Sequence, residues 1–323
     1  MNQWLYGESG YYAAYRPIGK KGDFYTAVST SKFFGGTIAK HIIKRIDEGF
    51  LRSDSLICEI GAHHGYLLAD IIEFIHTLRP QLLQTLRFGI VERFSTLQKH
   101  QRDYFDESFG NAVVLEHYSD LKEIESESAF FIANEIFDAF GCDLLYQGKI
   151  GRVEGDKVVF DLDSPEALEH ARKYKKDRGE IAVGYESFAR EMADSAKRFE
   201  FMSFDYGELE ARSDFSIRVY QEHQVYPLFD EALKLSEAFG KSDITYDVNF
   251  SHVKDAFASE GVRCEAYATQ LAALVNMGIL DLLSMLKEKA PEAIYAQELE
   301  KVKILITPSL MGERFKMIRF VKG

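Results

Sequence analysis

The chain has 323 residues, of which 46% are hydrophobic and 28% charged, a composition typical of a folded globular protein. Its net charge of -12 leaves no overall electropositive surface, so nucleic acid is not the expected partner. Three dispersed cysteines, Cys58, Cys142 and Cys264, provide neither a disulfide framework nor a paired metal motif. With no long apolar run and no signal-peptide pattern, the sequence predicts a cytoplasmic protein without membrane insertion.

The first clear elements form a strand, a turn and a helix. Residues 55–60, SLICEI, are a short apolar run closed by a glycine turn, which is typical of a buried parallel strand. Apolar residues recur at helical spacing over residues 66–76, and Pro80 lies just beyond the expected helix end. Further strands are expected at 88–91, 112–115 and 129–134. This alternation predicts an α/β fold with a mostly parallel, doubly wound sheet.

After residue 134 the alternation stops. Residues 144–160 resemble a β-hairpin with turns at QGK and EGD, and 199–207 resemble a fifth core strand. We expect residues 208–299 to be mainly helical. Two strand-like arms at 302–307 and 315–321 predict a hairpin that finishes the sheet.

These elements predict four parts of the chain. Residues 1–50 would form an N-terminal helical lid, and residues 141–195 a hairpin and helix insertion. A Rossmann-like cofactor-binding core would combine residues 51–140, 196–207 and 300–323. Residues 208–299 would form a substrate-side cap.

The turn after the first strand has the features of a nucleoside-cofactor site. Gly61 and Gly65 would allow backbone N–H groups to approach a ligand at the carboxyl end of a parallel strand. Glu92, which ends the next strand, could accept hydrogen bonds from both ribose hydroxyls, while Glu59 could orient the loop or meet a cofactor's ammonium group. The dinucleotide fingerprint GxGxxG is not met, and a purely structural glycine turn remains an alternative.

Eight ordered segments resemble one family over nearly the whole chain. They read GDFYTAVSTSKFFGGTIA from Gly22, EIGAHHGYLLADI from Glu59, ANEIFDAF from Ala133, FDYG from Phe204, IRVYQEH from Ile217, DITYDVNF from Asp243, TQLAALVNMGI from Thr269 and PSLMGERFKMIRF from Pro308. On these segments the sequence resembles the MidA/NDUFAF7 family of methyltransferases. The resemblance implies a class I methyltransferase fold, with an antiparallel final strand pair, and S-adenosyl-L-methionine as cofactor. It also implies a protein substrate, in particular an arginine of a respiratory complex I subunit; the oligomeric state stays open.

The family resemblance and the strand ends together give the candidate site residues. The cofactor-binding candidates are Gly22, Asp23, Thr26, Glu59, Gly61, Ala62, His63, Gly65, Glu92 and Asn134. The catalytic candidates are Glu135 and Asp138, which follow the fourth strand and could fix a guanidinium plane, and Tyr25 in the lid. Arg218, Tyr220 and His223 are candidates for the substrate side.

Several alternatives remain beside these assignments. His63 replaces the middle glycine of the family's turn, and the glutamate of the family's entrance segment is absent, so a methyltransferase fold that serves as a weakly active or inactive assembly factor is one alternative. A Rossmann oxidoreductase is another. Asp138 could simply cap a helix, and His223 could be structural. No metal site is predicted, because the adjacent side chains of His63 and His64 rarely converge on one ion.

Overall fold

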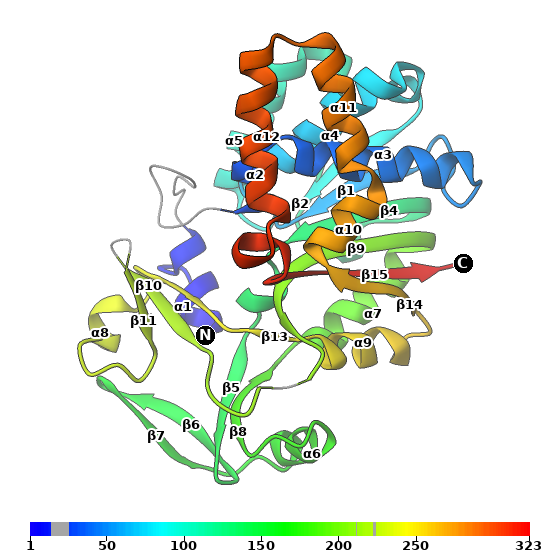
Figure 1. The fold of residues 1–323 in the computed structure, drawn as a ribbon. Coiled ribbons are helices and arrows are strands. Elements are labelled where there is room, and N and C mark those ends of the chain that lie inside the picture. Colours follow the sequence, from blue (N-terminus) through cyan, green and yellow to red (C-terminus); the bar gives the residue numbers. More distant parts are fainter. Residues whose placement is uncertain (14–25, 211, 222–223) are drawn as a thin grey trace. The chain divides into compact units, whose positions relative to one another are not determined.

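The computed structural model describes residues 1–13, 26–210, 212–221 and 224–323 (Figure 1). The chain forms two compact units, each assembled from three segments. The sheet unit contains Tyr25–Asn134, Arg190–Phe204 and Glu260–Gly323. The insertion unit contains Met1–Phe24, Glu135–Ala189 and Asp205–Ser259.

The sheet unit is built on strands in the order β14-β15-β9-β4-β1-β2-β3. Their bounds are β1 Leu56–Ile60, β2 Arg87–Val91, β3 Leu115–Tyr118, β4 Ser126–Asn134, β9 Ala196–Glu208, β14 Arg263–Thr269 and β15 Phe315–Lys322. The five strands from β9 to β3 pair in parallel, whereas β14 and β15 pair antiparallel. All five residues of β1 are buried, as its apolar sequence requires in a sheet covered on both faces.

The helices of this unit are α2 Ala27–Thr30, α3 Phe33–Asp47, α4 Tyr66–Leu78, α5 Ser95–Phe109, α10 Gln270–Met277, α11 Ile279–Lys289 and α12 Glu292–Ile306. Helix α3 packs closely on α4 because two glycines stand at the crossing. A Cβ atom at Gly35 would lie 2.7 Å from Cβ of Asp70, and one at Gly36 would lie 2.5 Å from the ring of Phe74. Short helical turns η2 Pro80–Gln84, η3 Gly110–Ala112, η4 Leu121–Glu123 and η6 Pro308–Gly312 connect these elements.

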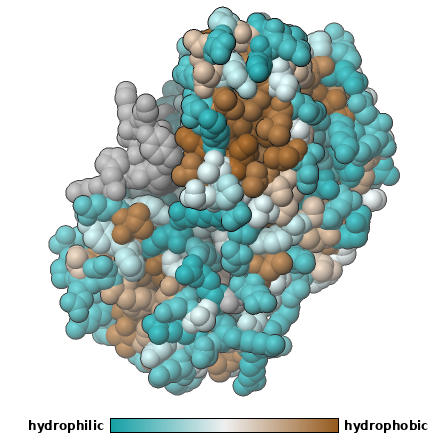
Figure 2. All heavy atoms as spheres, viewed as in Figure 1, coloured by the Kyte–Doolittle hydropathy of each residue, from teal (hydrophilic) through white to brown (hydrophobic). Residues whose placement is uncertain are grey.

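An apolar surface lies over α11 and α12 (Figure 2). Leu280 of α11 and Ile294 and Ile304 of α12 are each more than 40% exposed there. Among the described residues, no single helix is long and apolar enough to cross a membrane. Helices α10 and α11 meet that test of length and composition together, as a pair bent by 56°.

The insertion unit holds two small antiparallel sheets, ordered β7-β6-β5-β8 and β11-β10-β12. Its strands are β5 Cys142–Tyr146, β6 Lys149–Glu154, β7 Lys157–Leu162, β8 Arg178–Ala182, β10 Arg218–Gln221, β11 Gln224–Pro227, β12 Asp243–Thr245 and β13 Val248–Asn249. Its helices are α1 Asn2–Tyr6, α6 Pro165–Lys173, α8 Leu235–Ala238 and α9 Phe250–Ser259, with the turns η1 Tyr11–Ala13 and η5 Phe137–Ala139, and α7 Tyr185–Ser195 begins here. The N-terminus belongs to this unit: Trp4 is buried, and its indole N–H donates to the Ser242 carbonyl at 2.7 Å.

Most predicted core elements are confirmed, namely β1, α4, β2, β4, β9 and the hairpin of β6 and β7. Three predictions are wrong. The third strand begins at Leu115, not at Ala112, which lies in η3. Residues 208–299 contain β10 to β14 in addition to helices; most of these strands have only two to four residues, too few for a clear alternation.

The predicted final hairpin is also wrong in one arm. Residues 302–306 end helix α12, and the antiparallel partner of β15 is β14, which lies earlier in the chain. The run KVKILI alternates like a strand, but its buried residues, Val302 and Leu305, are three apart and therefore share one helix face. No proline or glycine lies between Pro291 and Pro308, so the helix continues to Ile306.

A buried charge network ties α3 to the sheet. Glu200 of β9 is fully buried and contacts His41 and Arg45 of α3, with the Arg45 Nε 2.7 Å from Glu200 Oε2. Arg319 of β15 lies 3.6 Å from the same carboxylate and 3.2 Å from Glu265 of β14. Burial raises the pKa of Glu200, but the His41 hydrogen bond and the nearby positive charges outweigh it, so the pKa lies below the usual 4.5.

We predict that Glu200→Gln lowers the free energy of unfolding by about 3 kcal/mol, because buried cations lose their counter-charge. Urea unfolding at pH 7 would measure this. Glu127→Gln is the matched control, since Glu127 is exposed and forms an ion pair with exposed Lys197, and should cost under about 1 kcal/mol. Since the pKa of Glu200 is depressed, the difference in unfolding free energy between wild type and Glu200→Gln should shrink as pH falls below 4.5. Equal losses of unfolding free energy in both variants at pH 7 would contradict the stabilising role of the network.

Candidate functional site

The turn between β1 and α4 adopts a backbone conformation that normally requires glycine. Gly61, His63 and Gly65 have φ values of 69°, 47° and 79°, so every second residue is left-handed. Gly65 caps α4, and a Cβ atom there would lie 3.0 Å from the Phe105 ring. Gly61 is exposed at the carboxyl end of β1, although its neighbours Ile60 and Ala62 are buried. The turn therefore offers accessible backbone where a nucleoside ligand of a parallel sheet binds.

Glu59 holds the start of α4. Its side chain is 4% exposed, and Oε2 accepts a hydrogen bond from the Leu68 N–H at 2.9 Å. Burial raises the pKa of this carboxyl to about 8, against the opposing effect of the Leu68 N–H. The carboxyl thus orients the loop and helix, one of the two roles that the sequence predicts for it.

Glu92 follows β2 directly and is 7% exposed. Its Oε1 accepts from the Phe94 N–H at 3.0 Å, and its backbone carbonyl accepts from Gln98 of α5 at 2.6 Å. Burial raises the pKa of Glu92, and the hydrogen bond from Phe94 partly offsets the rise. A rigidly held carboxylate at this strand end can accept hydrogen bonds from a diol.

The remaining cofactor candidates are placed in different ways. Asn134 ends β4 and is half-buried, and Ala62 is buried in the turn. Thr26 is the N-cap of α2, where its Oγ1 accepts from the Ser29 N–H at 3.2 Å. Gly22, Asp23, Tyr25 and His223 lie outside the described residues.

The insertion unit contains a second group of polar residues, which we call the Asp138 cluster: Asp138, Asp205, Tyr206, Arg218, Tyr220 and Asp247. Asp138 is 3% exposed, and the Tyr206 hydroxyl donates to its Oδ2. Its Oδ1 is buried and has no hydrogen-bond partner among the described residues. Burial raises the pKa of Asp138 to about 6, while the Tyr206 hydrogen bond and Arg218 act in the opposite direction.

Asp205, not Asp138, caps the turn that follows Glu135. Its Oδ2 accepts from the N–H groups of Phe137 and Asp138 at 2.9 and 3.3 Å, and Oδ1 accepts from its neighbour Tyr206 at 2.8 Å. The alternative that Asp138 is merely a helix cap is therefore wrong. Glu135 has a φ of 55°, an uncommon conformation for a residue with a side chain.

Arg218 lies on the Tyr206 ring, with its guanidinium carbon 4.7 Å from the ring centroid. It donates to Asp247 Oδ1 at 2.8 Å and to the Tyr220 hydroxyl at 3.0 Å. Arg212 also pairs with Asp247. Arg218 and Tyr220, which the sequence predicts on the substrate side, thus share one cluster with Asp138.

Sequence reasoning assigned no role to Asp205, Tyr206 or Asp247. A signal for Asp205 was present, because it is an acid near the end of a parallel strand, as Glu92 is. Asp247 had no such sequence signal, because it follows the strand β12, which has only three residues and is not recognisable from the sequence.

Among the described residues no group of three or more His, Cys, Asp or Glu side chains is arranged to hold a metal ion.

Comparisons with known proteins agree with this geometry. A model of the family described as "Putative S-adenosyl-L-methionine-dependent methyltransferase" matches residues 37–268. The mitochondrial protein arginine methyltransferase NDUFAF7 of Rattus norvegicus is 25% identical over 343 residues, covering 95% of this chain and 76% of the relative. The Xenopus laevis protein of that name is 25% identical and covers 97% and 77%. The resemblance predicted from the sequence segments is confirmed.

The same fold occurs in a solved structure from Burkholderia thailandensis that contains S-adenosyl-homocysteine. Its TM-score is 0.84 at 22% identity, over 99% of this chain and 86% of that one. The class I methyltransferase fold predicted from the sequence is thereby confirmed, whereas the roles of individual site residues remain predictions.

We predict that His63→Gly is more stable than His63→Ala by between about 0.5 and 1 kcal/mol, because both lack the ring and only glycine adopts φ 47° without strain. Urea unfolding of the two variants measures the difference. The same pair at His76, which is exposed inside α4, is the control and should show the opposite order. Equal stability of the two His63 variants would show that the backbone does not require glycine.

Proposed function

The chain belongs to the family of S-adenosyl-L-methionine-dependent methyltransferases, and from this premise we propose that it methylates a protein side chain, with arginine as the acceptor. Two kinds of observation support the proposal. The relatives carry the name of protein arginine methyltransferases, and the insertion unit contains a buried carboxylate suited to a guanidinium.

The residues of the sheet unit fit the cofactor. Gly61 exposes backbone at the strand end, Glu59 fixes the loop, and Glu92 presents a held carboxylate after the next strand. We propose that these residues and Asn134 hold S-adenosyl-L-methionine. When bound, this group supplies an electrophilic methyl on a sulfonium centre, so the protein's task is chiefly to align an acceptor and exclude water.

The observation that carries the acceptor assignment is the buried Oδ1 of Asp138, which has no hydrogen-bond partner in the part of the chain that the structure describes. A buried carboxylate oxygen without a donor is costly, and a ligand that brings N–H groups removes the cost. A guanidinium brings five N–H donors in a plane and pairs strongly with carboxylates. In this proposal Asp138 accepts from the acceptor arginine, Tyr206 fixes the carboxylate, and Asp205 fixes the turn that carries it.

The identity of the protein that carries the acceptor arginine is part of the same proposal. The family resemblance implies a subunit of a respiratory complex. An assay with radiolabelled S-adenosyl-L-methionine and such a subunit, followed by amino-acid analysis for methylarginine, tests both the residue type and the protein. Methyl transfer to lysine or to no protein would refute arginine as the acceptor.

For the cofactor, Glu92→Gln should weaken S-adenosyl-homocysteine binding by about tenfold to a hundredfold, since a charged acceptor of ribose hydroxyls is lost. Calorimetric titration measures the affinity. Glu116→Gln is the control, because Glu116 pairs with Arg87 on the surface of the sheet unit and should leave the affinity unchanged. Unchanged affinity in Glu92→Gln would refute the ribose assignment.

For the acceptor, Asp138→Asn should lower methyl transfer by about a hundredfold, because a neutral amide cannot orient the guanidinium by charge. The wild-type rate should rise with pH through about 6, where Asp138 loses its proton, and the variant should lack this rise. Since the folded-state pKa is raised, the charged carboxyl destabilises the fold at pH 7, and Asn should not lower the melting temperature. A full wild-type rate in the variant would contradict the assignment.

A further inference from the structure

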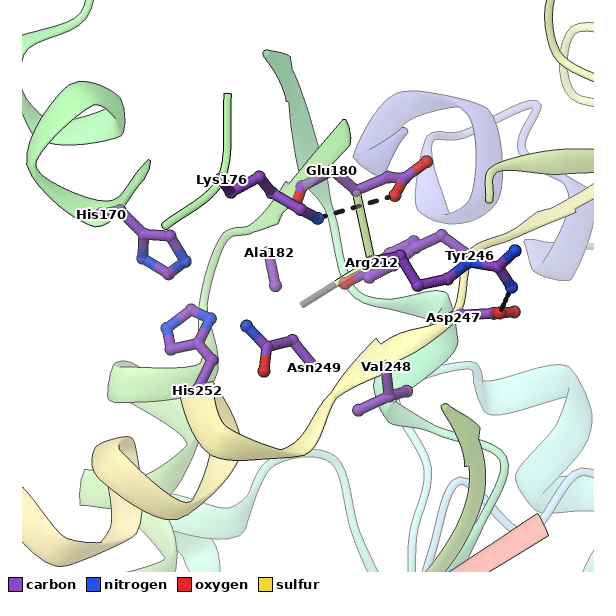
Figure 3. Close-up of a pocket in the computed structure, with 10 residues that line it drawn as sticks. All are labelled: His170, Lys176, Glu180, Ala182, Arg212, Tyr246, Asp247, Val248, Asn249 and His252. Carbon is purple, nitrogen blue, oxygen red and sulfur yellow. Dashed lines mark hydrogen bonds and ion pairs between the residues drawn. The ribbon is translucent and has the colours of Figure 1, made fainter. Parts of the chain in front are cut away.

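The charged groups that line the pocket of the insertion unit pair with one another (Figure 3). Lys176 lies 4.0 Å from Glu180, and Arg212 forms an ion pair with Asp247. Charges balanced in this way satisfy each other within the fold and do not need a ligand. A buried polar side chain that acts on a functional site is found instead in the sheet unit, at Gln101 of α5.

Gln101 is a polar residue on the apolar face of α5. It lies four residues after Leu97 and four before Phe105, so the three side chains share one side of the helix, and all three are buried. Gln101 itself is fully buried. Burying an amide costs free energy unless its N–H and C=O groups are hydrogen-bonded. The amide of Gln101 meets this requirement through bonds to two other elements of the sheet unit.

One end of the amide holds the turn between β1 and α4. Gln101 Nε2 donates to the His63 carbonyl at 2.9 Å. The direction of this carbonyl depends on the left-handed conformation of His63, whose φ is 47°. The stem of Gln101 packs against the same turn, since its Cγ would lie 3.8 Å from a Cβ atom at Gly65. Gln101 thus stabilises the turn where its backbone is least favourable.

The other end of the amide is held by His117 of β3. His117 Nε2 lies 3.0 Å from Gln101 Oε1. Because the His63 carbonyl can only accept, the NH₂ of Gln101 faces His63, and His117 must carry a proton on Nε2. Burial, followed by the charge of Arg102, lowers the pKa of His117 to about 4, so the ring is neutral at pH 7. The neutral Nε2–H ring therefore fixes the orientation of the amide.

The amide of Gln101 also acts on the carboxyl of Glu92. Burial raises the pKa of Glu92, and the Phe94 N–H, the charge of Arg93 and the amide of Gln101 oppose the rise. Helix α5 holds this acid a second time through Gln98, which donates to the Glu92 carbonyl at 2.6 Å. Gln101 therefore connects the two parts of the proposed cofactor site, the glycine turn and the acid after β2.

We infer that Gln101 is a positioning residue for S-adenosyl-L-methionine, which holds the turn of residues 61–65 in register with Glu92, and that His117 holds Gln101 in its working orientation. This role rests on the cofactor site proposed above. A ligand binds more tightly when the polar groups that meet it are already in place, because ordering them on binding costs free energy. Since Gln101 is fully buried, it acts through the turn and Glu92.

The test uses the whole chain and S-adenosyl-homocysteine. Gln101→Met keeps the length of the side chain and removes its hydrogen bonds, so calorimetric titration should show an affinity about tenfold lower. Gln270→Met is the matched control. Gln270 is also fully buried in the sheet unit and donates to a backbone carbonyl, that of Leu305, at 2.8 Å. It joins α10 to α12, which carry none of the proposed cofactor residues. Both variants should lower the melting temperature, and only Gln101→Met should lower the affinity.

A second pair of variants tests the same chain of bonds at His117, which is only half-buried, and decides the question if Gln101→Met does not fold. His117→Leu removes the donor to Gln101 Oε1 and should weaken binding by about threefold to tenfold. His117→Gln supplies an amide donor in its place and should restore most of the affinity. A histidine that only fills space would give no such rescue.

Two results would overturn the positioning role alone, provided that Glu92→Gln weakens binding. One is equal affinity of Gln101→Met and Gln270→Met, and the other is equal affinity of His117→Leu and His117→Gln. Wild-type affinity in Glu92→Gln, or no binding by the wild type, would instead refute the proposed cofactor site and the role of Gln101 with it.

Discussion

Buried carboxylates at the ends of parallel strands need backbone N–H groups, and this requirement organises both units. Glu59 accepts a hydrogen bond from the Leu68 N–H in the first turn of α4, and Glu92 accepts one from the Phe94 N–H just before α5. In the insertion unit Asp205 takes the N–H groups of Phe137 and Asp138. Each acid thereby fixes the start of a turn or helix, and its own oxygen atoms are fixed in return.

The same rule separates structural acids from acids left for a ligand. Asp205 has three backbone donors, so its carboxylate is committed to the fold. Asp138 accepts from the Tyr206 hydroxyl on one oxygen, and its other oxygen is buried without a donor among the residues that the structure describes. Because an unsatisfied buried acceptor costs about 1 to 3 kcal/mol, the fold keeps Asp138 at the expense of stability, as functional sites often do.

The sequence predicted features that depend on local spacing. Strand β1, its turn and α4 follow from one apolar run, two glycines and a helical periodicity. Features that depend on contacts between segments far apart in the sequence were missed or predicted wrongly. The pairing of β14 with β15 joins segments about fifty residues apart, and Asp205 caps a turn 67 residues before it. No periodicity within either segment reveals such a partner.

His63 illustrates how the structure changes an interpretation based on a single substitution. The sequence shows a side chain where the family has a glycine, which raised the alternative of a weak or inactive protein. The structure shows that the backbone still adopts glycine's left-handed conformation there, between the left-handed Gly61 and Gly65. Gln101 supports it by donating to the His63 carbonyl at 2.9 Å. The turn therefore keeps its shape although histidine disfavours the left-handed conformation. A backbone kept in a disfavoured conformation indicates that this shape is needed.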